Sequence, residues 1–489
     1  MLVACGLLAA LAFPSAAPAK RGLVTGFASD QYQSGDPAER ALWLDRTLDA
    51  GGGIVRLPVF WGLVAGPQRP PDPTNPGSGS YNFSSIDPGV RDAEARGITV
   101  LLTVSLPTPT WAEGPGRPAS AQPGSWKPNP SDLADFMQAL AARYSGGFDP
   151  DGAGPAPPLP AVEAVEIWNE PNLEFWLSPQ FEGKTPVGAD HYREMLNASY
   201  KAVKAVNPQI LVVTGGTAPY GDPPGGPYSS IGARARPVDF WQRVLCVHPG
   251  KKKKKTKKGK KGGGAPPAKL VITQGCAGRA LFDVFAHHPI SNTGRGPQES
   301  GPHRNDASTP DLGRVVRVLR GAESAGTVLP GRHPVWVTEL WWDSNPPNPS
   351  GAPLGVQARW IEESLYLFWK AGASAAINFR LRDSSERPNV LAGFQAGVFF
   401  DDGRPKPSLT AFRFPFVTER LNKQLLRAWG KAPAAGKLAI QQKQGGRWVT
   451  IRKIQVGKGA VFVAKLRLRG KQRLRATVGG NQSLVWNQG

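Results

Sequence analysis

Between residues 23 and 416, short apolar and β-branched runs alternate with longer segments whose apolar residues recur every three to four positions. The first pattern is typical of buried strands and the second of amphipathic helices. Strands that alternate with helices favour a parallel sheet in which helices connect neighbouring strands. The pattern predicts eight strands, at residues 23–28, 54–59, 99–104, 164–168, 210–215, 283–288, 335–339 and 375–380.

Seven helical segments are expected between these strands, and several begin with Asp, Ser or Pro, as helix starts often do. They cover residues 37–50, 86–96, 131–144, 189–207, 237–245, 311–325 and 356–371. Repeated strand and helix units in this number predict an α/β fold of the (β/α)8 TIM barrel type with long loops. An open doubly wound sheet is the alternative, but its first strand normally leads into a glycine-rich turn, and here Ser29-Asp30-Gln31-Tyr32 follows.

After Pro415 the pattern changes to segments in which apolar and polar residues alternate, as in antiparallel strands with one buried face. These segments are residues 436–442, 447–455, 459–468 and 473–479. We therefore predict a barrel over residues 20–416 and a small C-terminal antiparallel β domain over residues 420–489. The tail has no histidine, and no acidic residue follows Glu419, so we expect no catalysis there.

The first nineteen residues resemble a secretory signal, with an apolar run up to Phe13 and small residues before Ala19. We predict a signal peptide over residues 1–19 and bacterial-type export to the extracellular space. The apolar run is too short to span a bilayer, so no transmembrane segment is expected in the mature chain. In an exported chain Cys246 and Cys276 can form a disulfide, although two buried free thiols are the alternative. Two cysteines are too few for a metal site.

The net charge of +22 comes from two segments. Nine lysines lie between Lys251 and Lys261, inside a Lys-rich loop at residues 250–264, and the tail after Thr418 has sixteen Lys and Arg against Glu419 alone. The loop is expected to be solvated and to bind anionic cell-wall polymer weakly. It lacks the interleaved aromatic residues that bind single-stranded nucleic acid, so no specific nucleic acid is expected. The tail, with Trp448 and Trp486, could bind carbohydrate or an anionic surface, or could simply cover the barrel.

Two of the predicted strands end in a glutamate. The fourth runs into Trp168-Asn169-Glu170-Pro171, where the proline prevents the strand from continuing, and the seventh runs into Thr338-Glu339-Leu340-Trp341. Active sites of (β/α)8 barrels lie at the carboxyl ends of the strands, so both side chains should reach the same mouth. Two carboxyl groups that face each other there can act on a glycosidic bond.

These motifs resemble clan A of the glycoside hydrolases, the (β/α)8 enzymes that include families 5 and 39. The resemblance implies that Glu170 is the general acid/base, that Glu339 is the nucleophile and that Asn169 contacts the sugar 2-hydroxyl. It also implies that Arg56, in the second strand, holds the nucleophile ionised, and that His288, before Pro289, lines the sugar site.

Two positions depart from the clan pattern. Ile290 stands where many relatives have a tyrosine, and Asn378-Phe379-Arg380 ends the eighth strand, where a tryptophan is common. Sugar recognition is therefore expected to differ. His287, the neighbour of His288, could line the same site or could equally be a core residue.

Tryptophans near the predicted strand ends are candidates for sugar contacts, because the C–H faces of sugars pack on indole rings. About half of them are expected to contact substrate, the rest being core residues. They are Trp61, Trp111, Trp168, Trp176, Trp341 and Trp342.

The sequence thus predicts a secreted, retaining glycoside hydrolase that cleaves O-glycosidic bonds of β-linked glycans by double displacement. Its partner would be an oligosaccharide or polysaccharide, and no cofactor or metal is expected. One alternative is a non-catalytic glycan- or cell-wall-binding surface protein on a degenerate barrel. Another is a transglycosylase that uses the same two glutamates.

Overall fold

The computed structural model describes residues 22–152, 157–228, 232–250, 269–276, 278–291, 294, 296–385 and 393–489. The predicted signal peptide and the lysine run at residues 251–261 lie outside these residues. No helix among the described residues has the length and apolar character needed to cross a membrane.

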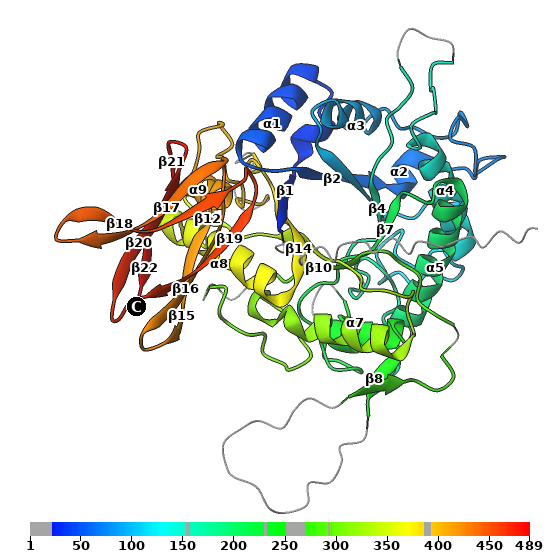
Figure 1. Ribbon diagram of the computed structural model, residues 1–489. Coiled ribbons are helices and arrows are strands. Elements are labelled where there is room, and N and C mark those ends of the chain that lie inside the picture. Colours follow the sequence, from blue (N-terminus) through cyan, green and yellow to red (C-terminus); the bar gives the residue numbers. More distant parts are fainter. Residues whose placement is uncertain are drawn as a thin grey trace, which may run out of the picture.

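Eight parallel strands form a single sheet that curls into a barrel (Figure 1). Its edge strands β7 and β10 are joined by bridges from Val213 to Val284 and from Thr217 to His287, which nearly close the cylinder. The (β/α)8 fold expected from the sequence is therefore confirmed. The barrel strands are β1 (Val24–Ala28), β2 (Ile54–Phe60), β3 (Thr99–Ser105), β4 (Ala164–Ile167), β7 (Leu211–Thr214), β10 (Phe285–His287), β11 (Val335–Leu340) and β14 (Ala373–Phe379).

Helices lie around the outside of the barrel, and side-chain caps fix where two of them begin. Asp36 accepts a hydrogen bond from the Ala38 amide, and Asn129 caps the next long helix in the same way ahead of a proline. All seven predicted helices are present, whereas the two short helices α2 and α9 were not among them. The helices are α1 (Pro37–Asp49), α2 (Trp61–Ala65), α3 (Asp87–Glu94), α4 (Pro130–Arg143), α5 (Gly188–Val206), α6 (Pro237–Val244), α7 (Gly313–Ala325), α8 (Leu354–Ala371) and α9 (Pro407–Arg413).

Short 3-10 turns and pairs of short strands lie in the segments that connect the barrel strands and helices. Three 3-10 turns, η1 (Asp30–Gln33), η2 (Thr110–Ala112) and η3 (Thr309–Asp311), follow barrel strands. The minor strand pairs are β5 (Phe181–Glu182) with β6 (Thr185–Pro186), β8 (Val247–Pro249) with β9 (Leu270–Ile272), and β12 (Ser344–Asn345) with β13 (Ala352–Pro353).

The described residues on either side of the lysine run are joined to each other. Strands β8 and β9 pair on either side of it, and Cys246 and Cys276, which flank this pair, form a disulfide. Of the two alternatives that the sequence left open, the disulfide is therefore the one present. A crosslink across a loop of this length restricts the unfolded chain more than the folded one.

The C-terminal region is antiparallel β structure, as predicted, and it forms two sheets. Strands β15, β16, β21 and β22 were missed, the first two because their apolar residues do not alternate strictly with polar ones. One sheet consists of β15 (Phe416–Asn422), β16 (Leu425–Lys431) and β19 (Val461–Arg467). The other consists of β18 (Arg447–Val456), β17 (Gly436–Gln444), β20 (Gln472–Val478), β21 (Asn481–Gln482) and β22 (Trp486–Gln488).

These sheets pack directly on the barrel and share its hydrophobic core. The Lys431 ammonium reaches Thr25 Oγ1 at 2.8 Å and the Gly51 carbonyl at 3.0 Å, at the amino end of the barrel strands. Burial lowers the pKa of Lys431 to about 8. Trp486 is buried and has the Arg359 guanidinium over its ring at 3.7 Å, so it is a contact with the barrel and not an exposed binding platform.

A buried carboxyl group also lies at this junction. Glu362 on α8 is fully buried and accepts a hydrogen bond from the Phe416 amide at 3.4 Å. Burial, which the amide only partly offsets, raises the pKa of Glu362 from 4.5 to about 8. A carboxyl group whose pKa is higher in the folded chain stabilises the fold below its ordinary pKa and loses that contribution as the pH rises to the folded value.

We predict that Glu362→Gln flattens the pH dependence of stability between about pH 5 and pH 8, because the variant lacks the carboxyl group that titrates in this range. Each unit by which folding raises the pKa corresponds to about 1.4 kcal/mol of unfolding free energy. The unfolding free energy of the wild type should fall across this window by more than that of the variant, as measured by urea unfolding. Glu363→Gln, one residue further along the helix and less buried, is the control and should behave like the wild type. Parallel curves for the wild type and Glu362→Gln would contradict the prediction.

Candidate active site

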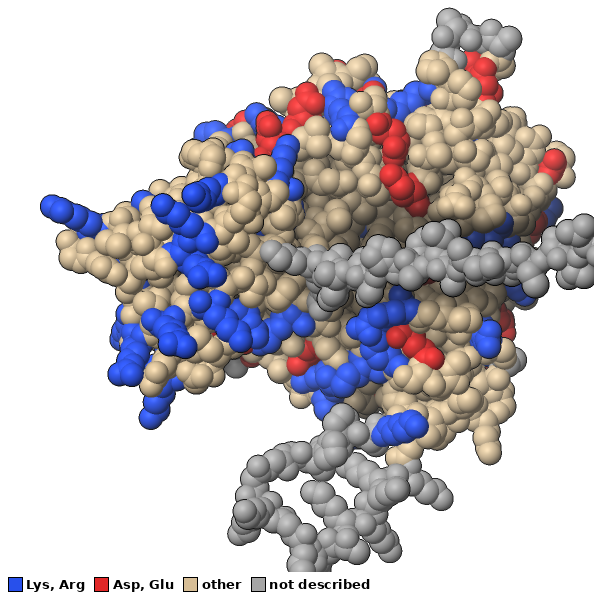
Figure 2. All heavy atoms as spheres, viewed as in Figure 1, with Lys and Arg blue, Asp and Glu red and all other residues tan. Residues whose placement is uncertain are grey.

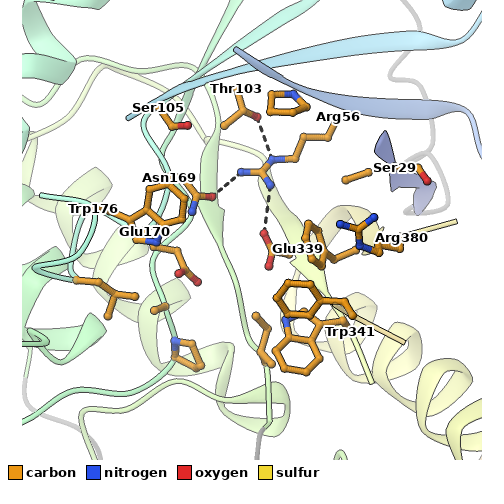
Figure 3. Close-up of a pocket in the computed structure, with 18 of the residues that line it drawn as sticks. Ser29, Arg56, Thr103, Ser105, Asn169, Glu170, Trp176, Glu339, Trp341 and Arg380 are labelled. Carbon is orange, nitrogen blue, oxygen red and sulfur yellow. Dashed lines mark hydrogen bonds and ion pairs between the residues drawn. The ribbon is translucent and has the colours of Figure 1, made fainter. Parts of the chain in front are cut away.

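The carboxyl ends of the barrel strands surround a cavity of about 500 Å³ (Figure 3). Both predicted glutamates line it. Glu170 follows β4, Glu339 lies in β11, and their carboxyl groups point into the space between them. Further lining residues include Ser29, Asp30, Arg56, Phe60, Thr103, Ser105, Asn169, Trp176, Tyr220, Arg234, Ile290, Trp341, Phe379, Arg380 and Phe394.

The chain turns sharply after β4, and this turn aims Glu170 at the cavity. Trp168 has φ 75° and Glu170 has φ 40°, both in the left-handed region that non-glycine residues seldom adopt. The Glu170 amide donates to the Gly216 carbonyl at 3.0 Å, and the buried Asn172 side chain holds the loop through bonds to Ala218 and Ala235. The surrounding structure thus compensates for the strain of the turn, as is common at functional sites.

His288 connects the two glutamates from below. Its Nδ1 lies 3.2 Å from Glu170 Oε1 and 3.9 Å from Glu339 Oε2, and its Nε2 lies 3.0 Å from Thr338 Oγ1. The two carboxylate oxygens are therefore at most about 7 Å apart, which is compatible with a glycosidase pair. His288 itself is fully buried and is not one of the residues that line the cavity, whereas the resemblance implied that it lines the sugar site.

Arg56 is the second link in the site. Its guanidinium contacts Glu339 Oε2 at 3.2 Å, Asn169 Oδ1 at 2.7 Å and Glu166 Oε2 at 2.8 Å. Because the Asn169 oxygen accepts this bond, its amide nitrogen can donate to a ligand in the cavity. Arg56 thus lies beside Glu339, at the position that the sequence predicted.

Sequence reasoning missed Glu166, which is fully buried two residues before Trp168. Besides Arg56, it accepts hydrogen bonds from the Thr103 hydroxyl at 2.7 Å and the Thr338 hydroxyl at 2.7 Å. Burial alone would raise the pKa of Glu166, but the charge of Arg56 and these hydrogen bonds lower it below the ordinary value. A charged residue inside an otherwise apolar strand was the signal that could have identified it.

The pKa of Glu339 shifts the other way. Burial raises it, the charge of Glu170 adds to the rise, and His288 and Arg56 partly oppose it. The resemblance to clan A implied that Arg56 keeps this residue ionised. Arg56 does favour the ionised form, as expected, but burial outweighs it.

Close packing also explains a glycine beneath the site. A Cβ on Gly216 would lie 2.2 Å from His288 Nε2 and 2.8 Å from Thr338 Oγ1. Only glycine therefore leaves room for the histidine that connects the two glutamates.

The tryptophans divide into wall and core residues. Trp341 and Trp176 line the cavity, on the sides of Glu339 and Glu170 respectively (Figure 3). Trp61 and Trp168 are fully buried, so of the six candidates these two are core residues.

Contacts of the indole rings explain why the other candidates miss the cavity. Trp168 donates its Nε1 to the Trp176 carbonyl at 2.8 Å. Trp111 packs edge-on against Trp61 and donates to the Gly66 carbonyl, so it does not line the cavity either. Trp342 is buried and donates to Ser364.

The end of the eighth strand provides a charged wall in place of the tryptophan common in the clan. Arg380 has φ 100°, pairs with Asp30 at 2.5 Å and lies near the rings of Phe379 and Phe394. On the sixth-strand side, Ile290 lines the cavity with an apolar side chain. Both departures from the clan pattern therefore face the site.

No family model matches the sequence, and no curated protein matches it either. Solved structures do resemble the fold. A glucosidase from Croceicoccus marinus superposes with a TM-score of 0.50 at 13% identity, over 92% of this chain and 94% of that one. At this identity the likeness concerns the fold alone.

Two further solved structures resemble this chain over a similar share of its length. A family 39 glycoside hydrolase from Bacteroides cellulosilyticus WH2 has a TM-score of 0.49 at 17% identity, over 92% of this chain and 81% of that one. A monomeric β-xylosidase from Caulobacter crescentus CB15 has a TM-score of 0.48 at 14% identity, over 91% and 94%.

We predict that Arg56→Met destabilises the protein by about 3–5 kcal/mol, because it leaves Glu166 buried without its counter-charge. Urea unfolding measures the effect. Arg69→Met is the control, since Arg69 is largely exposed and pairs with Asp132 and Asp135 at the surface. Such pairs contribute at most about 1 kcal/mol. An equal loss of unfolding free energy in the two variants would show that the buried ion pair stabilises the protein no more than a surface pair does.

Proposed function

We propose that this protein is a retaining glycoside hydrolase that cleaves O-glycosidic bonds of β-linked glycans. One observation supports the proposal most strongly. Carboxyl groups from β11 and from the turn after β4 face each other across one cavity and share a buried histidine. Two carboxyl groups so placed are the machinery of glycoside hydrolysis.

The separation of the two groups favours retention. Retaining pairs lie about 5–5.5 Å apart and inverting pairs about 6.5–9.5 Å apart, because an inverting enzyme must fit a water molecule beside the sugar. The contacts through His288 limit Glu170 Oε1 and Glu339 Oε2 to a separation of about 7 Å at most, which supports the closer, retaining arrangement.

The surroundings of the two groups support distinct roles. Glu339 pairs with Arg56, which stabilises the ionised form that a nucleophile needs. In the first step Glu339 attacks the anomeric carbon while Glu170 transfers its proton to the departing oxygen. In the second step Glu170 removes a proton from water, the water oxygen attacks the same carbon, and the bond to Glu339 breaks.

The walls of the cavity suit a sugar. Trp176 and Trp341 offer indole faces, and Asn169 offers an amide donor beside Glu170. The glucosidase with the same fold makes an aryl β-glucoside the first substrate to test. Xyloside, mannoside and arabinoside complete the panel.

Export is part of the proposal. The apolar N-terminal segment with Ala19 before Lys20, and a disulfide of the kind that persists in oxidising compartments, support secretion. N-terminal sequencing of protein from the culture medium should begin at Lys20. A mature protein that begins at Met1 would contradict this.

We predict that Glu339→Ala abolishes turnover of an aryl β-glycoside and that azide restores part of it. Azide would fill the space of the missing carboxylate and attack the anomeric carbon once, which gives the α-glycosyl azide. The configuration of the product is measured by NMR. Glu182→Ala, at an exposed glutamate, is the control and should keep full activity.

We predict a different product from Glu170→Ala. Activity on substrates with poor leaving groups should fall by about a hundred- to ten-thousand-fold, the usual contribution of a general acid. With an activated aryl leaving group the glycosyl-enzyme should accumulate, and azide should release the β-glycosyl azide after a second inversion. Azide products of the same configuration from both variants, or full activity of either, would refute the assignment.

A further inference from the structure

The five-stranded C-terminal sheet has one face packed in the core and one face open. Leu438, Ile440, Leu474, Ala476 and Val478 are buried on the inner face. Since side chains alternate along a strand, the residues between them belong to the outer face. We propose that this outer face binds an acidic polysaccharide, in addition to the site at the barrel mouth.

Strand register brings cations and amides together on this face. Lys443 pairs with Trp448, and Gln441 pairs with Arg475. Residues opposite each other on antiparallel strands share a face. The cations of the outer face are Lys437, Lys443, Lys453, Arg473 and Arg475.

These five cations lack acidic partners. No Asp or Glu follows Glu419 in the sequence, and Glu419 itself is bound by Tyr366, Lys370 and Arg427 where the sheets meet the barrel. Within the described part of the chain none of the five forms an ion pair. Figure 2 shows the result as Lys and Arg side chains spread over the C-terminal strands at the left. Such a field attracts polyanions.

Trp448 contacts two cations of the outer face through its ring. The Arg475 guanidinium lies 4.2 Å from the centre of its ring and the Lys443 ammonium lies 5.3 Å from it. Gln441 and Gln482 hold Arg475 further, through bonds of 2.7 Å and 2.6 Å. The guanidinium is thus positioned before a ligand arrives, which reduces the entropy that binding costs.

The chemistry of the face favours a polysaccharide over a nucleic acid. Single strands of nucleic acid bind through successive bases stacked on several aromatic rings. Trp448 is the one aromatic residue of this outer face, and cations already flank its ring. Glutamine amides can bind sugar hydroxyls, while the lysines and arginines can bind carboxylate or sulfate groups.

The test compares two triple variants of the full-length protein. Lys443→Gln, Arg473→Gln and Arg475→Gln remove three cations from the outer face. The control, Lys465→Gln, Arg467→Gln and Arg469→Gln, removes three exposed cations from β19 and the turn after it. Both variants keep residues 251–261, so the lysine run contributes equally to each. Calorimetric titration measures affinity for polygalacturonate, dextran sulfate, neutral dextran and oligo(dT), at several salt concentrations.

We predict that the wild type binds at least one of the two acidic polymers and does not bind neutral dextran. The outer-face variant should lose about tenfold or more in affinity, and its dependence on salt should weaken by about two released ions. The control should change by less than about threefold, as expected for cations outside the contact. Polygalacturonate and dextran sulfate distinguish a carboxylated ligand from a sulfated one.

Three results would overturn the proposal: equal losses in both variants, no binding to either acidic polymer, or tighter binding of oligo(dT) than of both. Because no hydrolysis is measured, these results are independent of the proposed glycosidase activity. Unchanged thermal unfolding of both variants shows that the fold is intact.

Discussion

The ion pair between Arg56 and Glu166 is the interaction on which the mouth of the barrel depends. One guanidinium reaches side chains from β3, β4 and β11 as well as the turn that holds Asn169. A buried ion pair of this kind contributes little net free energy to stability, because removing two ions from water is costly. It does fix the positions of the polar groups above it. The second glutamate, Glu339, thereby receives a positive neighbour at a defined distance.

Much of the fold could be predicted because its signals are local. Barrel strands are short apolar runs, their helices have a different period, and Pro171 marks where the fourth strand stops. The two facing glutamates follow from the same logic, since carboxyl ends of parallel strands meet at one mouth. Strands β15 and β16 lacked such a signal, because burial against both the barrel and the neighbouring sheet removes the alternation.

The details of the site could not be predicted, because they depend on direction and on distant partners. Glu166 meets an arginine that precedes it by more than a hundred positions, and no local pattern reveals that pairing. Trp168 points into the core because its positive φ breaks the strand's alternation. His288 lies beneath the cavity and not in its wall, since its ring fits where Gly216 has no side chain. Residue type indicates what a side chain can do, but not which way it faces.

The C-terminal sheets have a further role that follows from Lys431. Its ammonium inserts at the amino end of the barrel, the end opposite the cavity, and it bonds with the first strand and with the loop before the second. The C-terminal sheets therefore help to cover the amino end of the barrel. In a chain that stops after α9, Thr25 Oγ1 and the Gly51 carbonyl would lose these bonds and become exposed to water. A different C-terminal domain in the same place would need a cation at the position of Lys431.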